Sequence, residues 1–201
     1  MFYEPSKGHG LPHDPFKAIV APRPIGWISS LSADGALNLA PYSFFNALGT
    51  HPHLVMFSSE GEKDSASFSR ESGEFVANLV SRALAEKMNL SSINAPRGTS
   101  EFGYAGLTPA PSLLVKPPRV AEALAALECK VTEVHRPVGL DGRPSRNVIV
   151  FGEVVGVHID ESILTDGLFD IVKAGTVARL GYMDYTSVAE TFAMRRPKWE
   201  K

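Results

Sequence analysis

The chain has 201 residues, with 20 Lys and Arg against 22 Asp and Glu, a formal net charge of −2 and a single cysteine. This length predicts one domain, and the small net charge argues against nucleic acid as the main partner. Every apolar run is too short for a membrane helix, the first residues lack a signal peptide and one cysteine excludes internal disulfides, so a cytoplasmic protein is expected.

The first third of the chain predicts hairpins. Residues 1–15 contain several prolines and glycines and predict an extended arm lying on the body of the protein. In residues 25–31, Ile25, Trp27, Ser29 and Leu31 alternate with Gly26, Ile28 and Ser30, which predicts a largely buried strand. Asp34-Gly35 predicts a tight turn after it, and residues 37–40 are expected to form the returning strand of the hairpin. Because proline cannot donate a backbone hydrogen bond, residues 41–46 are expected to leave the sheet or run along its edge.

The next segment mixes strands with short helices. Residues 50–53 predict a turn and 54–58 a short apolar strand. A helix is expected to begin at Asp64 or Ser65 and to stop at Gly73, and a strand follows over 74–80. Ser81 is then expected to cap a second helix in which Leu84, Met88 and Leu90 share one face.

The second half is expected to hold one long irregular segment and a second hairpin. Residues 91–118 are rich in Ser, Gly and Pro and predict a long loop of the kind that is usually functional or part of a dimer contact. Helical spacing gives way to strand alternation near residue 126, and residues 147–159 form the partner strand. The chain therefore predicts a single mainly β domain over residues 1–201, an antiparallel barrel with short helices.

Common catalytic and metal-binding motifs are missing. Gly8-His9-Gly10 lacks a third glycine and a preceding strand, and no phosphate-binding loop follows. His51 and His53 lack a third ligand nearby, so no metal site is expected. Cys129 lies among apolar residues and is expected to be a buried, inert thiol. His135 and His158 end strand segments, where structural hydrogen bonds are expected.

Residues 23–65 combine small hydroxyls, aromatic side chains and prolines, and end in Lys63-Asp64-Ser65. This mixture suits a flat, phosphorylated ligand such as a flavin, because its ring needs an apolar surface and its phosphate needs hydroxyls, amides and a cation. The alternative is that Trp27, Phe44 and Phe45 are core residues and Lys63 a surface charge. Composition by itself favours this alternative slightly.

The order and spacing of several motifs favour the flavin. The string Arg23-Pro24-Ile25-Gly26-Trp27-Ile28-Ser29-Ser30, then Asn38-Leu39-Ala40-Pro41-Tyr42-Ser43-Phe44-Phe45-Asn46 and Lys63-Asp64-Ser65, resembles the flavin reductase-like FMN-binding split-barrel family. It is most similar to the branch with flavoredoxin and the reductase components of two-component flavin monooxygenases. Arg179-Leu180-Gly181 with Tyr185 also fits, and the resemblance covers residues 15–197.

The resemblance implies a six-stranded antiparallel Greek-key split barrel that forms a homodimer, with one FMN per subunit in a groove at the interface. Ser65 replaces the expected threonine but keeps its hydroxyl. No catalytic side chain is required, because the flavin carries the chemistry. The residues expected beside the flavin are Ser29, Ser30, Asn38, Tyr42, Ser43 and Phe44, and Trp27 and Asn46 are also expected to bind the cofactor. Those expected at the phosphate and ribityl chain are Ser58, Ser59, Lys63 and Ser65. Arg179 is expected to reach the cofactor within the chain or across the dimer.

The implied reaction is hydride transfer from NADH or NADPH to the flavin, with reduced flavin passed to a partner monooxygenase. Relatives that use NADH often carry Gly-Asp-His where this chain has Gly152-Glu153-Val154, which weakens the expectation of nicotinamide use but not of FMN binding. Two alternatives remain. One is a flavoredoxin-like electron-transfer protein reduced by a protein partner, and the other is a non-enzymatic dimer that binds flavin, another ligand or none.

Overall fold

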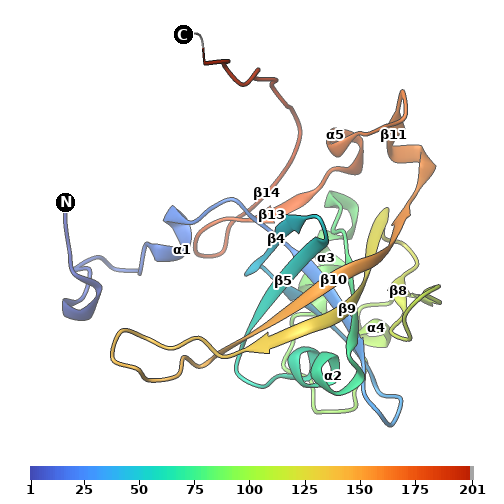
Figure 1. Cartoon of the computed structure of the whole chain (residues 1–201), viewed down its shortest axis with the longest axis horizontal. Coiled ribbons are helices and arrows are strands. Elements are labelled where there is room, and N and C mark those ends of the chain that lie inside the picture. The colour runs from blue at the N-terminus through green and yellow to red at the C-terminus, as the bar shows by residue number, and fades with distance from the viewer. Residues whose placement is uncertain (200–201) are drawn as a thin grey trace.

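The computed structural model describes residues 1–199, and its centre is one seven-stranded antiparallel sheet (Figure 1). The strands follow in the spatial order β3-β2-β6-β9-β10-β5-β4. Their bounds are β2 Gly26–Leu31, β3 Leu37–Tyr42, β4 Phe45–Thr50, β5 His53–Glu60, β6 Glu74–Asn78, β9 Ala125–His135 and β10 Asn147–Ile159. The fold is thus mainly β and antiparallel, as the sequence predicts.

The sheet curls so that its two edges meet. β3 and β4 occupy opposite ends of the strand order, yet only Ser43 and Phe44 separate them in the chain. The three Cα–Cα steps from Tyr42 to Phe45 span at most about 11 Å, so the edge strands must approach each other at this crossing. The Ser58 amide donates to the Phe44 carbonyl at 2.8 Å and ties the crossing to β5. The result is a half-barrel whose seam runs past residues 41–44.

The strand count and the role of Pro41 differ from the sequence predictions. The main sheet has seven strands, not six, because residues 45–50 pair with β5. Pro41 does not end its strand but lies within β3. Because β3 is an edge strand with a partner on one side only, a proline without an amide hydrogen is tolerated there.

The remaining elements are short. The small strands are β1 Arg23–Pro24, β7 Pro109–Ala110, β8 Arg119–Val120, β11 Leu164–Thr165, β12 Leu168–Phe169, β13 Val177–Arg179 and β14 Tyr185–Ser187. The helices are α1 Phe16–Ile19, α2 Asp64–Ser72, α3 Ala85–Leu90, α4 Glu101–Tyr104 and α5 Ile171–Ala174, with 3-10 turns η1 Pro5–Lys7, η2 Arg82–Leu84 and η3 Glu161–Ile163. β1, β13 and β14 form a separate three-stranded sheet.

Aromatic side chains fill the core on both faces of the sheet. Phe57 and Phe75 pack edge-to-face inside the barrel, with ring centroids 5.3 Å apart. Trp27 belongs to the other cluster, with Met88 of α3 and Phe102 of α4 packed around it. Cys129 is completely buried, as predicted, and burial raises the pKa of its thiol.

The helix predictions are confirmed in part. α2 ends at Gly73, whose φ of 72° is left-handed, a conformation that glycine adopts without strain. Ser81 makes no capping hydrogen bond through its side chain, which corrects its predicted role. Leu84 and Met88 are buried but Leu90 is 44% exposed. α3 ends at Leu90, so that side chain lies beyond the packed face.

A buried carboxylate fixes part of the long loop. Glu128 of β9 is 0% exposed, and it accepts hydrogen bonds from the amides of Leu113 (2.7 Å), Leu114 (2.6 Å) and Val115 (3.2 Å). His158 Nε2 lies 2.5 Å from the same carboxylate, which confirms a structural hydrogen bond for that histidine. Burial alone would raise the pKa of Glu128, but the contacts with His158 and these amides outweigh burial and hold it below its ordinary value.

Close packing against Gly152 gives a stability prediction. A Cβ at Gly152 would lie 2.5 Å from the buried Phe75 ring, whereas one at Gly156, on the same strand, would meet nothing closer than 3.4 Å. Gly152→Ala is therefore expected to lower the free energy of unfolding by about 1–3 kcal/mol because the core must shift. Urea denaturation should give Gly156→Ala a change of less than about 1 kcal/mol. Equal changes for the two variants would contradict this packing.

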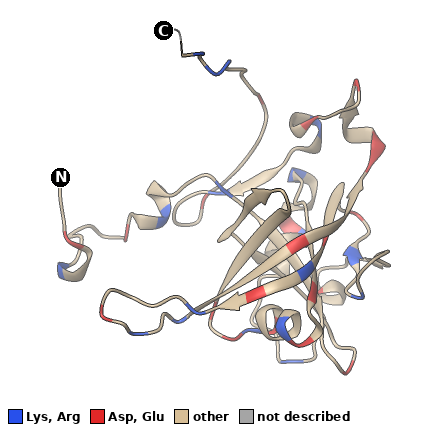
Figure 2. Ribbon diagram, viewed as in Figure 1, with Lys and Arg blue, Asp and Glu red and all other residues tan. Residues whose placement is uncertain are grey.

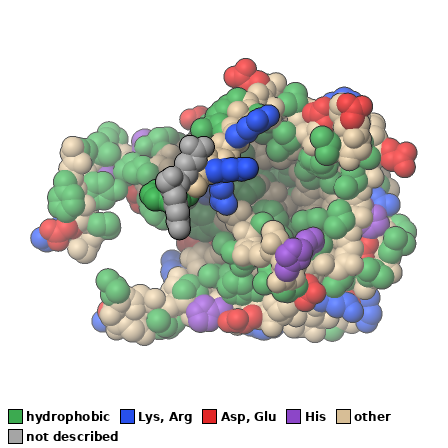
Figure 3. Space-filling model, turned by 45° about the horizontal axis from the view of Figure 1, so that its top comes forward, with side chains coloured by type: hydrophobic (Ala, Val, Ile, Leu, Met, Phe, Trp, Pro, Cys, Tyr) green, Lys and Arg blue, Asp and Glu red, His purple; other side chains and the backbone are tan. Residues whose placement is uncertain are grey.

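Two segments stand away from the barrel. The N-terminal arm projects from the body (Figure 1), which corrects the prediction that it lies on the surface. The tip of the β9–β10 hairpin also projects, with open space between it and the arm (Figure 3).

Basic and acidic residues are interspersed along the ribbon (Figure 2). Within residues 1–199, no helix has both the length and the apolar character needed to cross a membrane.

Candidate functional site

A hollow of about 240 Å³ opens at the start of α2. Lys63 precedes the helix in an extended conformation, and no side chain caps the first turn. The first amides of α2 therefore remain available to an external acceptor. Lys63 and Ser65 both line the hollow. A helix start, a hydroxyl and a cation together favour an anionic group at this position.

Hydrogen bonds through Asn38 join β3 to α2. The Asn38 side-chain amide donates to Ser65 Oγ at 2.7 Å and to Ser30 Oγ at 3.2 Å. All three side chains are buried. The structure thus brings together three residues that the sequence places beside the phosphate and the ring, and it fixes their orientation with bonds inside the protein.

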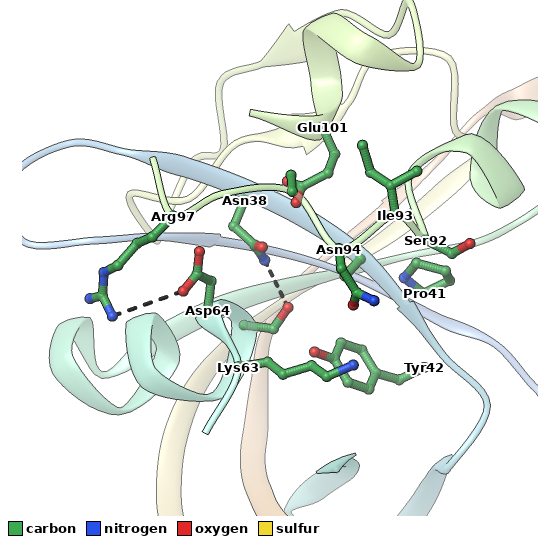
Figure 4. A pocket seen from close by; sticks show the side chains of 13 residues that line it. Asn38, Pro41, Tyr42, Lys63, Asp64, Ser92, Ile93, Asn94, Arg97 and Glu101 are labelled. Atoms are coloured by element: carbon green, nitrogen blue, oxygen red, sulfur yellow. Dashed lines mark hydrogen bonds and ion pairs between the residues drawn. The ribbon is translucent and has the colours of Figure 1, made fainter. Parts of the chain in front are cut away.

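The opposite wall of the hollow comes from the loop after α3. Ser92, Asn94 and Arg97 line it, as Figure 4 shows. Arg97 Nη1 lies 3.9 Å from Asp64 Oδ1, and the guanidinium stacks over the Phe68 ring at 5.0 Å from its centroid. The sequence did not predict these residues as part of the site. Its only signal was the length of the irregular segment 91–118, which indicates a functional loop but not which of its residues line a site.

Glu101 and Tyr42 add protonatable groups to the same hollow. Glu101 Oε2 accepts from the Leu39 amide at 3.0 Å. Burial raises the pKa of Glu101, and the hydrogen bond from Leu39 opposes this only in part. Burial also raises the pKa of Tyr42. Both groups are therefore held toward their neutral, hydrogen-bond-donating forms, which suits a ligand carrying hydroxyl groups.

A second hollow of about 420 Å³ continues along the seam of the barrel. Pro41, Tyr42 and Lys63 line both hollows, so the two form one groove. Ser43 and Phe44, at the crossing between β3 and β4, lie on the floor of the second hollow with Ser58. This floor offers an apolar surface and the backbone of the crossing. We call the two hollows together the seam groove.

Other predicted site residues lie elsewhere. Trp27 is completely buried and its Nε1 donates to Ser91 Oγ at 2.8 Å. Ser29 is also fully buried, with its hydroxyl donating to the Pro118 carbonyl. Ser59 is buried close to the groove, and its hydroxyl has no hydrogen-bond partner among the described residues. Trp27 and Ser29 are thus core residues, which corrects their expected place at the cofactor.

Asn46 and Arg179 are also outside the seam groove. Asn46 is exposed on β4, and its Oδ1 accepts from the Ala47 amide at 2.8 Å. Arg179 lines three neighbouring hollows and stacks on the Tyr185 ring, with 4.3 Å between the guanidinium carbon and the ring centroid. Among residues 1–199, no group of three or more His, Cys, Asp or Glu side chains is arranged to hold a metal ion.

Three solved structures share this fold over most of their length. Nitrilotriacetate monooxygenase component B from Bacillus cereus is 27% identical with a TM-score of 0.87, covering 96% of this chain and 98% of that chain. The 2-nitrobenzoate 2-nitroreductase NbaA of Pseudomonas fluorescens is 28% identical with a TM-score of 0.80, over 92% and 90% of the two chains. Flavoredoxin of Desulfovibrio vulgaris is 26% identical with a TM-score of 0.76, over 86% and 90%.

The sequence also matches a family description directly. The family described as "Flavin reductase like domain" matches residues 20–177, a range that contains β2 to β10 and every residue of the seam groove except Phe16 and Lys17. The split-barrel resemblance read from the sequence is therefore confirmed. The chain belongs to the flavin reductase-like family.

Proposed function

We propose that the protein is an FMN-dependent oxidoreductase that takes a hydride from NADH or NADPH and supplies reduced flavin to a partner monooxygenase. One observation carries the proposal: the uncapped start of α2 and the Lys63 cation meet where the two hollows of the seam groove join. This position suits a phosphate, and the second hollow continues from it along Pro41 and Phe44. Membership of the flavin reductase-like family supports the same ligand.

The residues of the groove fit FMN part by part. Lys63, Ser65 and the first amides of α2 would hold the phosphate, with Arg97 on the opposite wall. Asn38 and Glu101 would bind the ribityl hydroxyls. The backbone of residues 41–44 would carry the ring. Bound FMN would supply the hydride chemistry itself, so the protein needs only to position the two reactants.

A homodimer is part of the proposal. Large apolar side chains are exposed on both projecting segments, including Phe2 at 88% and Val138 at 66%. Exposed apolar surface of this kind typically marks an interface. The arm and the hairpin tip leave open space between them (Figure 3), and in the proposed dimer a second copy of the chain would fill this space and cover the flavin.

The partner and the acceptor are proposed from the solved relatives. One relative is described as a monooxygenase component, which supports a partner oxygenase. Flavoredoxin supports the alternative that a protein donor, not a nicotinamide, reduces the flavin. The relative described as a 2-nitrobenzoate 2-nitroreductase makes an anionic nitroaromatic a further acceptor to test.

A spectrum of the purified protein loaded with FMN, followed by anaerobic addition of NADH and NADPH, tests these functions together. Loss of the flavin absorption with either nucleotide is the expected result. Stable FMN binding without reduction by either nucleotide would favour the flavoredoxin-like alternative. A protein that takes up no FMN would contradict the proposal entirely. Light scattering on the same sample measures whether the chain is dimeric.

A further inference from the structure

A separate cavity of about 400 Å³ lies between the end of the N-terminal arm and the turn after β13. His13, Asp14 and Lys17 line one side. Arg23 of β1 and Arg179 of β13 line the other. No function proposed above uses this cavity. Its walls come from segments more than 150 residues apart in the chain, as the 157-residue separation between Arg23 and its partner Leu180 shows.

The cavity has an excess of positive charge. Lys17, Arg23 and Arg179 face it, and Asp14 is the one carboxylate among its lining residues. Asp14 Oδ1 accepts from the Phe16 amide at 2.9 Å. Among the ion pairs that residues 1–199 form, none includes any of the three cations. The cations therefore face the cavity without a paired counter-ion.

Arg23 is the buried member of these three cations. The residue is only 6% exposed, and its guanidinium donates hydrogen bonds to the carbonyls of Lys17, Val20 (2.6 Å) and Leu180 (2.9 Å). Carbonyl oxygens carry partial charges and do not neutralise a full positive charge, so an unpaired buried guanidinium destabilises the site. Burial and the nearby charge of Arg179 both lower the pKa of Arg23. An anion between the two guanidinium groups would relieve this repulsion.

The cavity is built into the fold. A Cβ at Gly181 would lie 2.4 Å from Ala18 Cβ and 2.8 Å from Ala18 Cα, so the glycine lets α1 approach the turn after β13 closely. Arg23 reaches carbonyls on both sides of this contact. Backbone carbonyls thus hold two of the three cations in place: Arg23 through these contacts, and Arg179 through a hydrogen bond that it donates to the Tyr182 carbonyl.

The cavity also adjoins the seam groove. Ser43 and Lys17 line both, and Arg23 Nε donates to Ser43 Oγ at 3.4 Å. A molecule with its anionic group in the cavity would therefore lie next to the part of the groove proposed to carry the flavin ring. The FMN phosphate is proposed for Lys63 and the start of α2, and neither of these lines the cavity. With FMN bound in this way, the cavity would remain available to an anionic group of a second molecule.

We infer that the cavity lined by Lys17, Arg23 and Arg179 is an oxyanion-binding subsite for the second substrate, the molecule that exchanges electrons with the flavin. This inference rests on the proposed function. The oxyanion is a phosphate if it comes from a nicotinamide dinucleotide donor, and a carboxylate if it comes from an aromatic acceptor. Both bind guanidinium groups in the same way.

The test uses Arg179→Gln in the FMN-loaded protein, with Arg143→Gln as the control. Arg143 is an exposed arginine on the hairpin loop that pairs with Asp141 at 3.5 Å. Calorimetric titration with inorganic pyrophosphate should show binding to the wild-type protein and to the control, and binding about tenfold weaker for Arg179→Gln. The Kd for FMN should change less than about twofold, because Arg179 lies outside the seam groove.

Kinetic measurements identify the source of the oxyanion. If it is the donor, Arg179→Gln raises the KM for NADH or NADPH about tenfold and leaves the KM for the uncharged donor 1-benzyl-1,4-dihydronicotinamide unchanged. If it is the acceptor, the KM for 2-nitrobenzoate rises and that for nitrobenzene does not. Gly181→Ala keeps every charge but pushes α1 away, and it should weaken pyrophosphate binding as well.

Three results would overturn the inference: no pyrophosphate binding to the wild-type protein, unchanged KM values for all charged substrates, or a loss of FMN affinity as large as the loss for pyrophosphate. The last result would make Arg179 a cofactor ligand. Failure of the proposed function looks different. In that case no nucleotide reduces the flavin, while pyrophosphate binding still depends on Arg179.

Discussion

Glu128→Leu is expected to lower the free energy of unfolding by about 3–5 kcal/mol, the largest effect of any single substitution considered for stability. Leucine removes the acceptor for three backbone amides and for His158. It leaves the amide of the buried Val115 without this partner and removes the shared anchor of the other three donors. The loop at residues 113–115 should then detach from β9. Urea denaturation followed by Trp27 fluorescence measures the loss.

Glu133→Leu is the matched control, because Glu133 lies on the same strand with a side chain that is 64% exposed. Its free energy of unfolding should change by less than about 0.5 kcal/mol. Glu128→Gln keeps one acceptor oxygen and should lose about 1–3 kcal/mol. A Glu128→Leu protein as stable as the Glu133→Leu protein would show that the buried carboxylate does not anchor the loop.

The pH dependence of this contribution has a definite sign. The pKa of Glu128 is lowered in the folded protein, so its stabilising effect is complete above the unfolded pKa of about 4.3. It is lost as the pH falls through the lower, folded pKa. The stability difference between the wild-type and Glu128→Gln proteins should therefore narrow below about pH 4.

Lys63→Glu is expected to weaken FMN binding at least about 100-fold, and Lys63→Ala about tenfold. Alanine removes one charge-assisted contact with the phosphate, whereas glutamate adds a like charge beside it. A titration that follows the quenching of FMN fluorescence measures both. Lys130→Glu is the control, because Lys130 is exposed on β9 and does not line the seam groove.

The fold should respond to Lys63→Glu in the opposite direction. An acidic side chain at the start of α2 interacts favourably with the helix dipole, so the melting temperature should stay the same or rise slightly. Weaker FMN binding in a protein of undiminished stability separates a lost contact from a damaged fold. An unchanged Kd for FMN in Lys63→Glu would remove Lys63 from the proposed site.

Local patterns predicted much of the fold. The strand pairs around Asp34-Gly35 and the stop of α2 at Gly73 were predictable, because turn residues and alternation are local signals. Pro41 predicted that residues 41–46 leave the sheet or run along its edge, and they lie on and between its two edge strands. A separate strand β4 was not predicted. Whether a proline interrupts a strand depends on whether the strand is at an edge, which only the assembled sheet decides.

The candidate site was predictable where short motifs carried it. Asn38, expected beside the ring, and Ser65, expected at the phosphate, both line the groove, but Trp27 and Ser29 do not. Alternation on β2 explains the difference, because side chains two apart share a face. Trp27 lies in a core cluster and Ser29 bonds to the Pro118 carbonyl, whereas Ser30 accepts a hydrogen bond from Asn38. Arg97 was not predictable, because an irregular loop has no periodicity from which to infer its direction.

The seam between β3 and β4 is the place where a ligand would enter this barrel with the fewest broken backbone hydrogen bonds. Both are terminal strands of the sheet and do not pair with each other, so they would separate there without breaking the backbone hydrogen bonds among β2, β6, β9 and β10. A closed cylinder would have to break such bonds to admit a ring as wide as a flavin. Opening at the seam would be a local event and not global unfolding, so the proposed flavin would exchange while the rest of the sheet stays folded.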